Sequence, residues 1–261
     1  MVRSYDETST HLKLHYRLMR TKQTLSHVKR MYIKHHPDNN NLQMTIWEAL
    51  DQLKDFIDTS DPDVTIANFA HAFQTAEGIR EAGLPEWLQV TGLIHDIGKV
   101  MYLRGCDEDG TSIRKQWSIA GDIYVIGHPL PECLVLPEYN AYAPKEMVDY
   151  SRNCGFDQCY MSYGHDEYLY NVLVANREKV RLPLEALYII RYHSFYAWHS
   201  NDAYTELESQ YDRSMKGWVK LFNQYDLYTK ESINFSEDEI SKMCIYYGKL
   251  VDKYLPGKLN W

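Results

Sequence analysis

One short segment combines residue types that could do chemistry with a helix that should be buried. The segment GLIHDIGKV, residues 92–100, places His95 beside Asp96 in an otherwise apolar helical pattern, with Lys99 one turn later. Burying charged groups costs free energy unless they are paired or bind a metal. Imidazole nitrogen and carboxylate oxygen are metal donors, and a lysine on roughly the same helix face could stabilise negative charge there. The segment therefore indicates a buried reactive site.

The helix that carries His95 is expected to pair with the helix before it. Gly83 separates two helical patterns, and Pro85 is suited to open the second one. His71 lies twelve residues before Gly83, and His95 lies twelve residues after it. At a rise of about 1.5 Å per residue, both imidazoles lie about 18 Å from the turn and can face each other. The sequence therefore predicts a helical hairpin with two facing histidines.

A second pair of histidines has the same relation to a later turn. His165 lies fourteen residues before Lys179 and His193 lies fourteen residues after it, with Pro183 suited to start the second helix. Asp226, in the segment FNQYDLYTK, offers another carboxylate from a later helix. Two hairpins and one further helix are therefore expected to supply one set of donors.

The donor set contains imidazoles and carboxylates and no sulfur. Such a set suits iron or manganese better than structural zinc. Two metals about 3.5–4 Å apart that share the carboxylate of Asp96 fit this number of ligands. A single helical histidine is more often a hydrogen-bonded core or surface group, so the prediction rests on the combination. The predicted metal ligands are His71, His95, Asp96, His165, His193 and Asp226.

The remaining histidines have no comparable setting, and we expect them at the surface or in loops. A second His-Asp pair occurs in GHDEY, where Asp166 is expected to cap a helix or to orient a metal-binding histidine. The histidines expected at the surface or in loops are His11, His15, His27, His35, His36, His128 and His199.

Helical periodicity dominates the whole chain. Two capping boxes, Thr45 with Glu48 and Ser236 with Glu239, mark the starts of helices. No alternating strand pattern of useful length occurs, although IYVIGHPL, residues 123–130, could form a short strand. The sequence therefore predicts an all-α fold. Helices are expected at residues 16–36, 45–58, 68–82, 85–103, 145–153, 166–178, 183–196, 203–230 and 236–255.

The longest irregular segment directly follows the reactive helix. Residues 104–144 are rich in Gly, Pro and Asp. Long loops inside compact domains are usually functional lids or disordered insertions. We therefore expect a single domain over residues 1–261, with residues 104–144 forming a lid or insertion near the buried site.

Composition and charge argue against several classes of partner. The formal net charge of −8 disfavours a nucleic-acid surface, because phosphate binding needs clustered Lys and Arg. No apolar run is long enough to cross a bilayer, and the first residues lack the apolar stretch of a signal peptide. The five cysteines lack CxxC spacing and favour reduced thiols. We expect a cytoplasmic monomer with no nucleic-acid or membrane partner.

At these residues the chain resembles myo-inositol oxygenase, a family of di-iron oxygenases in the HD-domain superfamily. The HD pair alone would point only to the superfamily, whereas longer matches run over nearly the whole chain. These matches are SDPDV, HAFQTAEGIR, HDIGK, GHDEY, RYHSFYAWH, FNQYDLYTK and DKYLPGKLNW.

The resemblance implies an HD-type helical domain with a buried dinuclear centre of two iron ions in the mixed Fe(II)/Fe(III) state. The two irons would share Asp96. The implied ligands are His71, His95, Asp96 and Asp226 at one iron, and Asp96, His165 and His193 at the other.

The implied reaction is oxidation of myo-inositol by O2 to D-glucuronate, with cleavage of one ring C–C bond. Asp96 and Lys99 would be catalytic, with Lys99 stabilising negative charge on a substrate hydroxyl. Each implied substrate contact also has a structural alternative, such as a turn, a helix end or a lysine that reaches solvent. The implied substrate contacts are Arg3, Asp58, Ser60, Lys99, Gly121, Asp122, His193 and Ser194.

Two departures from the family pattern bear on the substrate. Arg3 lies almost at the start of the chain, and the segment CDEDGTSIRK, residues 106–115, looks inserted. Three alternatives therefore stay open. These are a metal-dependent phosphohydrolase of the same superfamily, an oxygenase acting on another cyclitol, and a metal-free scaffold with the same fold. A phosphohydrolase would need several Arg or Lys around its phosphate, whereas a scaffold would be expected to lack at least one metal ligand.

Overall fold

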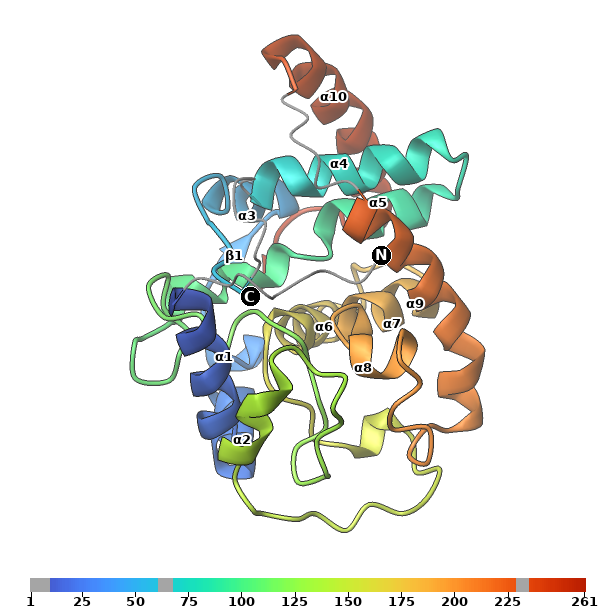
Figure 1. Cartoon of the computed structure of the whole chain (residues 1–261). Coiled ribbons are helices and arrows are strands. Elements are labelled where there is room, and N and C mark those ends of the chain that lie inside the picture. Colours follow the sequence, from blue (N-terminus) through green and yellow to red (C-terminus); the bar gives the residue numbers. More distant parts are fainter. Residues whose placement is uncertain (1–9, 61–67, 229–234) are drawn as a thin grey trace.

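In the computed structural model, which describes residues 10–60, 68–228 and 235–261, helices make up nearly all regular structure (Figure 1). The predicted all-α fold is confirmed for these residues. The α-helices are α1 (Thr10–Lys22), α2 (Leu25–Lys34), α3 (Ile46–Gln52), α4 (Asn68–Glu81), α5 (Glu86–Ile94), α6 (His165–Ala175), α7 (Leu184–Tyr192), α8 (Tyr196–His199), α9 (Gln210–Tyr228) and α10 (Glu237–Tyr254). The 3-10 helices are η1 (Pro37–Asn39), η2 (Ile97–Arg104), η3 (Pro137–Tyr142) and η4 (Phe156–Gln158). The strands of the described part, β1 (Gln43–Met44) and β2 (Leu259–Asn260), pair antiparallel.

Both predicted capping boxes are present. The hydroxyl of Thr45 accepts a hydrogen bond from the Glu48 backbone N–H at 3.1 Å, and the Glu48 carboxylate accepts one from the Thr45 N–H at 2.7 Å. Ser236 and Glu239 form the same reciprocal pair at the start of α10. Each box satisfies backbone donors that the first helical turn leaves unpaired, which is why the sequence located these two helix starts well.

Several predicted helices differ from the observed ones. The expected helix 16–36 is two helices. The first, α1, ends at Lys22, and Thr24 caps α2 by accepting from the His27 N–H at 3.0 Å. The expected helix 85–103 changes to the 3-10 helix η2 after α5. The expected helix 203–230 begins only at Gln210. The type of each segment was therefore predicted better than its ends.

The expected helix 145–153 is wrong, and the short strand that residues 123–130 could form is reduced to one bridge. Residues 145–153 form an irregular segment whose Val148 N–H donates to the Gly127 carbonyl at 2.8 Å, so the backbone of one loop bonds another. Within residues 123–130, Val125 forms one isolated bridge with Met161. Residues 104–144 are irregular as expected, apart from turns and the 3-10 helix η3.

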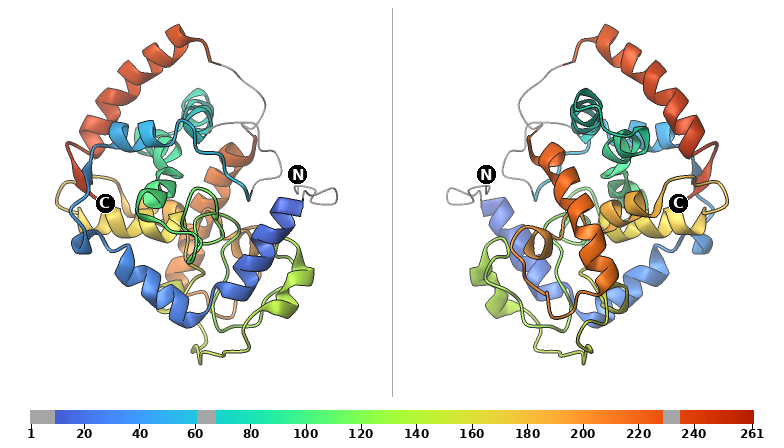
Figure 2. Two further views of the ribbon diagram at one scale, coloured as in Figure 1. Left: turned by 90° about the vertical axis from the view of Figure 1, so that its left-hand side faces the viewer. Right: turned by 90° about the vertical axis from the view of Figure 1, so that its right-hand side faces the viewer.

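Two helical hairpins form the centre of the molecule. Helix α4 packs on α5, α6 packs on α7, and α9 packs against α4, α5 and α7. Figures 1 and 2 show α1, α2 and the irregular segment at the opposite end of the molecule from α4 and α10. Fully buried apolar side chains such as Leu93, Ile189 and Phe222 fill the space between the helices. This packing fixes the relative positions of the hairpins that carry the predicted metal ligands.

Two findings bear on expectations from composition. No helix in the described ranges is both long and apolar enough to cross a membrane. All five cysteines are free, in agreement with the expected reduced thiols.

A close backbone contact joins η2 to α6. A Cβ atom at Gly98 would lie 2.1 Å from the carbonyl oxygen of His165 and 3.0 Å from the Cβ of Leu169. Only glycine therefore lets η2 come this close to α6. The contact places Asp96, which directly precedes η2, beside the first turn of α6.

Gly98→Ala is expected to lower the free energy of unfolding by about 1–3 kcal/mol, because a methyl group must force η2 away from α6. Urea denaturation of the purified protein measures this change. Gly217→Ala is the matched control, since a Cβ there meets no atom within 4 Å and alanine favours the helix. Equal stability of the Gly98 variant and the wild type would show that the close contact between η2 and α6 does not require glycine.

Candidate metal centre

The α4–α5 hairpin brings two histidines together, as the residue counts around Gly83 predict. His71 lies in the first turn of α4 and His95 directly follows α5, and their ring centroids are 5.2 Å apart. Asp226 of α9 approaches both rings. Its Oδ1 lies 2.9 Å from Nε2 of His71 and 3.4 Å from Nε2 of His95. These three buried side chains form one potential metal-binding group.

The α6–α7 hairpin forms a second group. His165 is the first residue of α6 and His193 directly follows α7. The Nε2 atoms of the two rings are 3.2 Å apart. Both are buried, so the two nitrogens converge on one point away from solvent.

Backbone carbonyls fix which ring nitrogen faces the centre. In His95, His165 and His193 the Nδ1 atom lies within hydrogen-bond distance of a carbonyl oxygen, at 2.7 to 2.9 Å. A carbonyl only accepts, so Nδ1 must donate and Nε2 keeps its lone pair for a metal. The accepting carbonyls belong to Gly92, Ile119 and Ile190.

Asp96 lies between the two groups. Its Oδ1 is 3.1 Å from Nε2 of His165 and 3.7 Å from Nε2 of His193. Its Oδ2 is 3.7 Å from Nε2 of His95, which has no hydrogen-bond partner although it is buried. One carboxylate therefore presents one oxygen to each group of histidines, which is the arrangement that a bridging ligand requires.

The electrostatics of the centre favour cations. Burial raises the pKa of Asp96, but the charges of Lys99 and His95 lower it by more than burial raises it. The pKa of Asp96 therefore lies well below its ordinary value. Burial also raises the pKa of Asp226, and His71 and His95 bring it well below its ordinary value. Carboxylates beside imidazoles are a donor set for iron, manganese or zinc, and the absence of thiolate disfavours structural zinc.

Asp166 lies next to the Nδ1 atoms of both histidines in the second group. This is the position expected for a carboxylate that orients a metal-binding histidine. Its Oδ1 lies 3.1 Å from Nδ1 of His193, and its Oδ2 lies 3.4 Å from Nδ1 of His165. Burial lowers the pKa of His193, but Asp166 and Asp96 raise it more, to about 9. The negative field that favours a proton on His193 would equally favour a metal cation at its Nε2.

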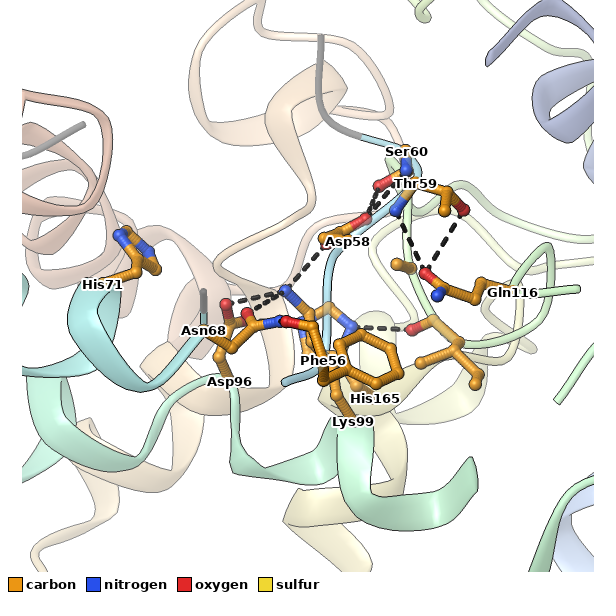
Figure 3. A network of polar contacts seen from close by, with 12 residues as sticks. Phe56, Asp58, Thr59, Ser60, Asn68, His71, Asp96, Lys99, Gln116 and His165 are labelled. Carbon is orange, nitrogen blue, oxygen red and sulfur yellow. Dashed lines mark hydrogen bonds and ion pairs between the residues drawn. The ribbon is translucent and has the colours of Figure 1, made fainter. Parts of the chain in front are cut away.

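Lys99 links the metal centre to the neighbouring part of the pocket (Figure 3). Its ammonium group donates to Asp96 Oδ2 and to Asp58 Oδ2, each at 2.7 Å, and to Asn68 Oδ1 at 3.1 Å. Burial lowers the pKa of Lys99, but the two carboxylates raise it above its ordinary value. The side chain therefore stays charged and points inward, so the alternative of a lysine that reaches solvent is wrong.

Asp58 is held in place from both sides. Its Oδ1 accepts from the Ser60 backbone N–H at 2.8 Å and from the Ser60 hydroxyl at 2.6 Å, while its Oδ2 accepts from Lys99. Gln116 anchors the same segment by accepting from the Thr59 N–H at 3.1 Å (Figure 3). Asp58 and Ser60 thus form a turn, which was the structural alternative to a substrate contact. They also line the pocket.

A single pocket collects the predicted site residues that the structure describes, except His95, which is buried behind the lining. Those expected to contact substrate reach it from four separate segments. The Ile123 N–H donates to the Ser194 carbonyl at 3.1 Å and so joins two of these segments. Arg3 lies outside the described residues. The inserted-looking segment 106–115 supplies no lining residue. The predicted residues that line the pocket are Asp58, Ser60, His71, Asp96, Lys99, Gly121, Asp122, His165, His193, Ser194 and Asp226.

Sequence reasoning missed three side chains that line this pocket and misplaced four histidines. Tyr16, Val135 and Tyr196 belong to the lining, and their sequence settings resemble those of ordinary core residues. His11 and His36 are exposed, and His128 is half-buried in a loop, as expected. The surface expectation is wrong for His15, His27, His35 and His199, which are all buried.

The buried histidines illustrate why that expectation failed. His15 lies on the inward stripe of α1 with Leu12 and Met19, and its Nε2 lies 3.1 Å from the Ala120 carbonyl oxygen. Burial lowers its pKa below the ordinary value, which favours a neutral core residue. A polar residue on an apolar stripe is tolerated when a specific partner meets it, and the sequence does not reveal the partner.

Comparisons with known proteins agree with this geometry. The sequence model of the family described as "Myo-inositol oxygenase" matches residues 9–261. The inositol oxygenase of Danio rerio is 42% identical over 258 residues, covering 94% of this chain and 87% of the relative. The inositol oxygenase of Mus musculus is 40% identical over 256 residues, with coverages of 94% and 85%. Inositol oxygenase 1 of Arabidopsis thaliana is 40% identical over 256 residues, with coverages of 94% and 78%.

Asp166→Asn is expected to weaken metal retention about 10- to 100-fold, because carboxylates behind metal-binding histidines orient the rings and raise their basicity. Metal content after dialysis against a graded series of chelator concentrations measures the change. Asp157→Asn is the matched control, because Asp157 pairs with Arg191 of the same hairpin and not with an imidazole. Retention equal to that of the wild type would contradict this role for Asp166.

Proposed function

The chain belongs to the myo-inositol oxygenase family, and from this premise we propose that it oxidises myo-inositol with O2 to D-glucuronate, cleaving one ring C–C bond. The observation that carries the proposal is the position of Asp96, with one oxygen toward each group of histidines and Lys99 on Oδ2. This arrangement suits a shared pair of metals next to a polar pocket.

The proposed cofactor is a pair of iron ions in the mixed Fe(II)/Fe(III) state. The buried donor set fits such a pair, because Nε2 of His95 lacks a hydrogen-bond partner and the Nε2 atoms of His165 and His193 lie only 3.2 Å apart. When bound, the irons would supply Lewis-acid and redox chemistry. The proposed ligands are His71, His95, Asp96 and Asp226 for one iron, and Asp96, His165 and His193 for the other.

Lys99 and its partners would position and polarise the substrate. The Lys99 ammonium is already charged and fixed by two carboxylates, so it can stabilise negative charge that develops on a substrate hydroxyl without first reorganising. Asp58 and Asp122 would accept hydrogen bonds from other hydroxyls, and the backbone at Gly121 and the hydroxyls of Ser60 and Ser194 would complete the contacts. Arg3 stays a proposed contact on the resemblance alone.

The charge of the pocket supports a neutral polyol over a phosphate ester. Among the described lining residues, Lys99 is the only lysine or arginine, whereas four aspartates are present. Asp58 and Asp122 would repel a phosphate placed near Lys99. We therefore place a phosphohydrolase below the oxygenase, and another cyclitol stays an alternative substrate because the lining does not identify the ring stereochemistry.

The test of this function is anaerobic loading with iron, followed by O2 uptake and glucuronate formation with inositol and its stereoisomers. We expect glucuronate from myo-inositol and no phosphate release from nucleotides. Phosphate release without O2 uptake would favour the phosphohydrolase, and iron-free protein from iron-replete medium would favour a metal-free scaffold. The single domain over residues 1–261, the monomeric state and the cytoplasmic location stay predictions.

Asp96→Ala is expected to abolish turnover and to loosen both metals, because it removes the one carboxylate that faces both groups of histidines. Iron per chain by mass spectrometry and O2 uptake measure the two effects. Asp252→Ala, at an exposed position, is the control. Full iron content with normal activity in the Asp96 variant would overturn the assignment.

Lys99→Ala is expected to lower turnover about 100-fold, because it removes a fixed charge that stabilises the reacting oxygen. Iron should be retained, because Lys99 is not one of the predicted metal ligands. Steady-state kinetics and iron content are measured together. Lys253→Ala, which removes an exposed lysine paired with Glu86, should leave both unchanged. Unchanged kinetics of the Lys99 variant would show that Lys99 does not stabilise the reacting oxygen.

A further inference from the structure

One wall of the substrate pocket rests on helix α1, which carries none of the predicted site residues. The wall is the segment of residues 120–122, in which Gly121 has a positive φ of 111°. His15 of α1 contacts the Ala120 carbonyl oxygen, and Arg20 of α1 binds the side chain of Asp122. The position of Asp122 in the pocket therefore depends on a helix that precedes it by about 100 residues in the chain.

Arg20 and Asp122 form a buried ion pair. The Arg20 Nη2 donates to Asp122 Oδ1 at 3.1 Å and to Oδ2 at 3.2 Å. The Arg20 side chain is 0% exposed and that of Asp122 is 3% exposed. Burying a charge without its partner is strongly unfavourable, so the two side chains need each other in this place.

The same guanidinium also holds the neighbouring loop. Its Nη2 donates to the Val135 carbonyl at 3.1 Å, and its Nε donates to the Asn140 side-chain oxygen at 3.2 Å. Val135 lines the pocket, and Asn140 lies in η3. Arg20 therefore connects α1 to Asp122 and to the 135–140 segment through one rigid planar group.

The hydrogen bonds leave Asp122 with an acceptor site to spare. A carboxylate has about four lone-pair sites, two on each oxygen. Oδ2 accepts from Arg20 and from the Val135 N–H at 2.9 Å, whereas Oδ1 accepts from Arg20 alone. Oδ1 thus keeps capacity for one more donor, and Asp122 lines the same pocket as Lys99 and Ser194.

We propose that Arg20 is a positioning residue of this site, which holds the Asp122 carboxylate so that Oδ1 accepts a hydrogen bond from one hydroxyl of the polyol. The inference rests on the proposed function and goes beyond it, because it adds a residue that does not touch the substrate. An acceptor fixed in this way selects for a hydroxyl at one ring position. A substrate analogue that lacks this hydroxyl leaves a buried acceptor unpaired and is bound poorly.

Arg20→Gln is expected to raise the KM for myo-inositol about 10- to 100-fold with a smaller change in kcat, because a binding contact to a charged group is lost. Arg20→Lys keeps the charge without the forked geometry and should recover part of the loss. Arg17→Gln is the matched control, since Arg17 is exposed on α1 and stacks on Tyr142 of η3 without reaching Asp122. Iron content and melting temperature are recorded for each variant.

A double-mutant cycle separates positioning through Asp122 from a general structural role. In an Asp122→Asn background, Arg20→Gln should change KM less than about twofold, because the group that Arg20 positions is already altered. An equal rise in KM in both backgrounds would overturn the proposal. So would a loss of melting temperature and kcat with KM unchanged, which is the pattern of a purely structural residue.

A crystal structure of the Arg20→Gln protein tests the positioning without reference to activity. We expect the Asp122 carboxylate to turn away from its wild-type orientation, and an unchanged carboxylate would overturn the proposal. If the wild-type protein fails to oxidise inositol, the proposed function fails, whereas the orientation of Asp122 still decides the inference. If the wild type is active and Arg20→Gln behaves like Arg17→Gln, the inference alone fails.

Discussion

The structure depends on one buried carboxylate that serves two groups of histidines. Asp96 is 7% exposed, yet it accepts from Lys99 and lies within 3.7 Å of ring nitrogens from both hairpins. A buried charge is tolerable only where opposite charges or metal ions surround it. The helices that approach Asp96 must therefore meet at one point, and the glycine contact between η2 and α6 lets them do so.

In the proposed function, the site around this point has a side that would bind the metals and a side that would bind the substrate. Backbone carbonyls orient the rings of His95, His165 and His193, so that Nε2 of each ring points toward the centre. The Asp166 carboxylate lies behind the last two rings. On the other side, Lys99, Asp58 and Asp122 are held by bonds that lie outside the pocket or along its wall. Preorganised groups of this kind stabilise developing charge better than mobile ones.

The sequence predicted the all-α fold and the convergence of six donor side chains because both follow from helical geometry. A constant rise per residue makes equal counts around a turn a reliable guide to facing positions, so His71 with His95 and His165 with His193 were found. The role of Arg20 could not be found from the sequence, because its ion pair with Asp122 is set by packing between distant segments. The predicted helix at residues 145–153 was wrong for the same reason, because the backbone of this segment forms a hydrogen bond with another loop.

The central claim is that Asp96 joins two metal ions, and anomalous diffraction at the iron absorption edge from crystals of the iron-loaded protein tests it most directly. We expect two anomalous peaks about 3.5–4 Å apart, with one Asp96 oxygen next to each and the two groups of histidines on opposite sides. A single peak, or two peaks of which only one lies beside Asp96, would contradict it.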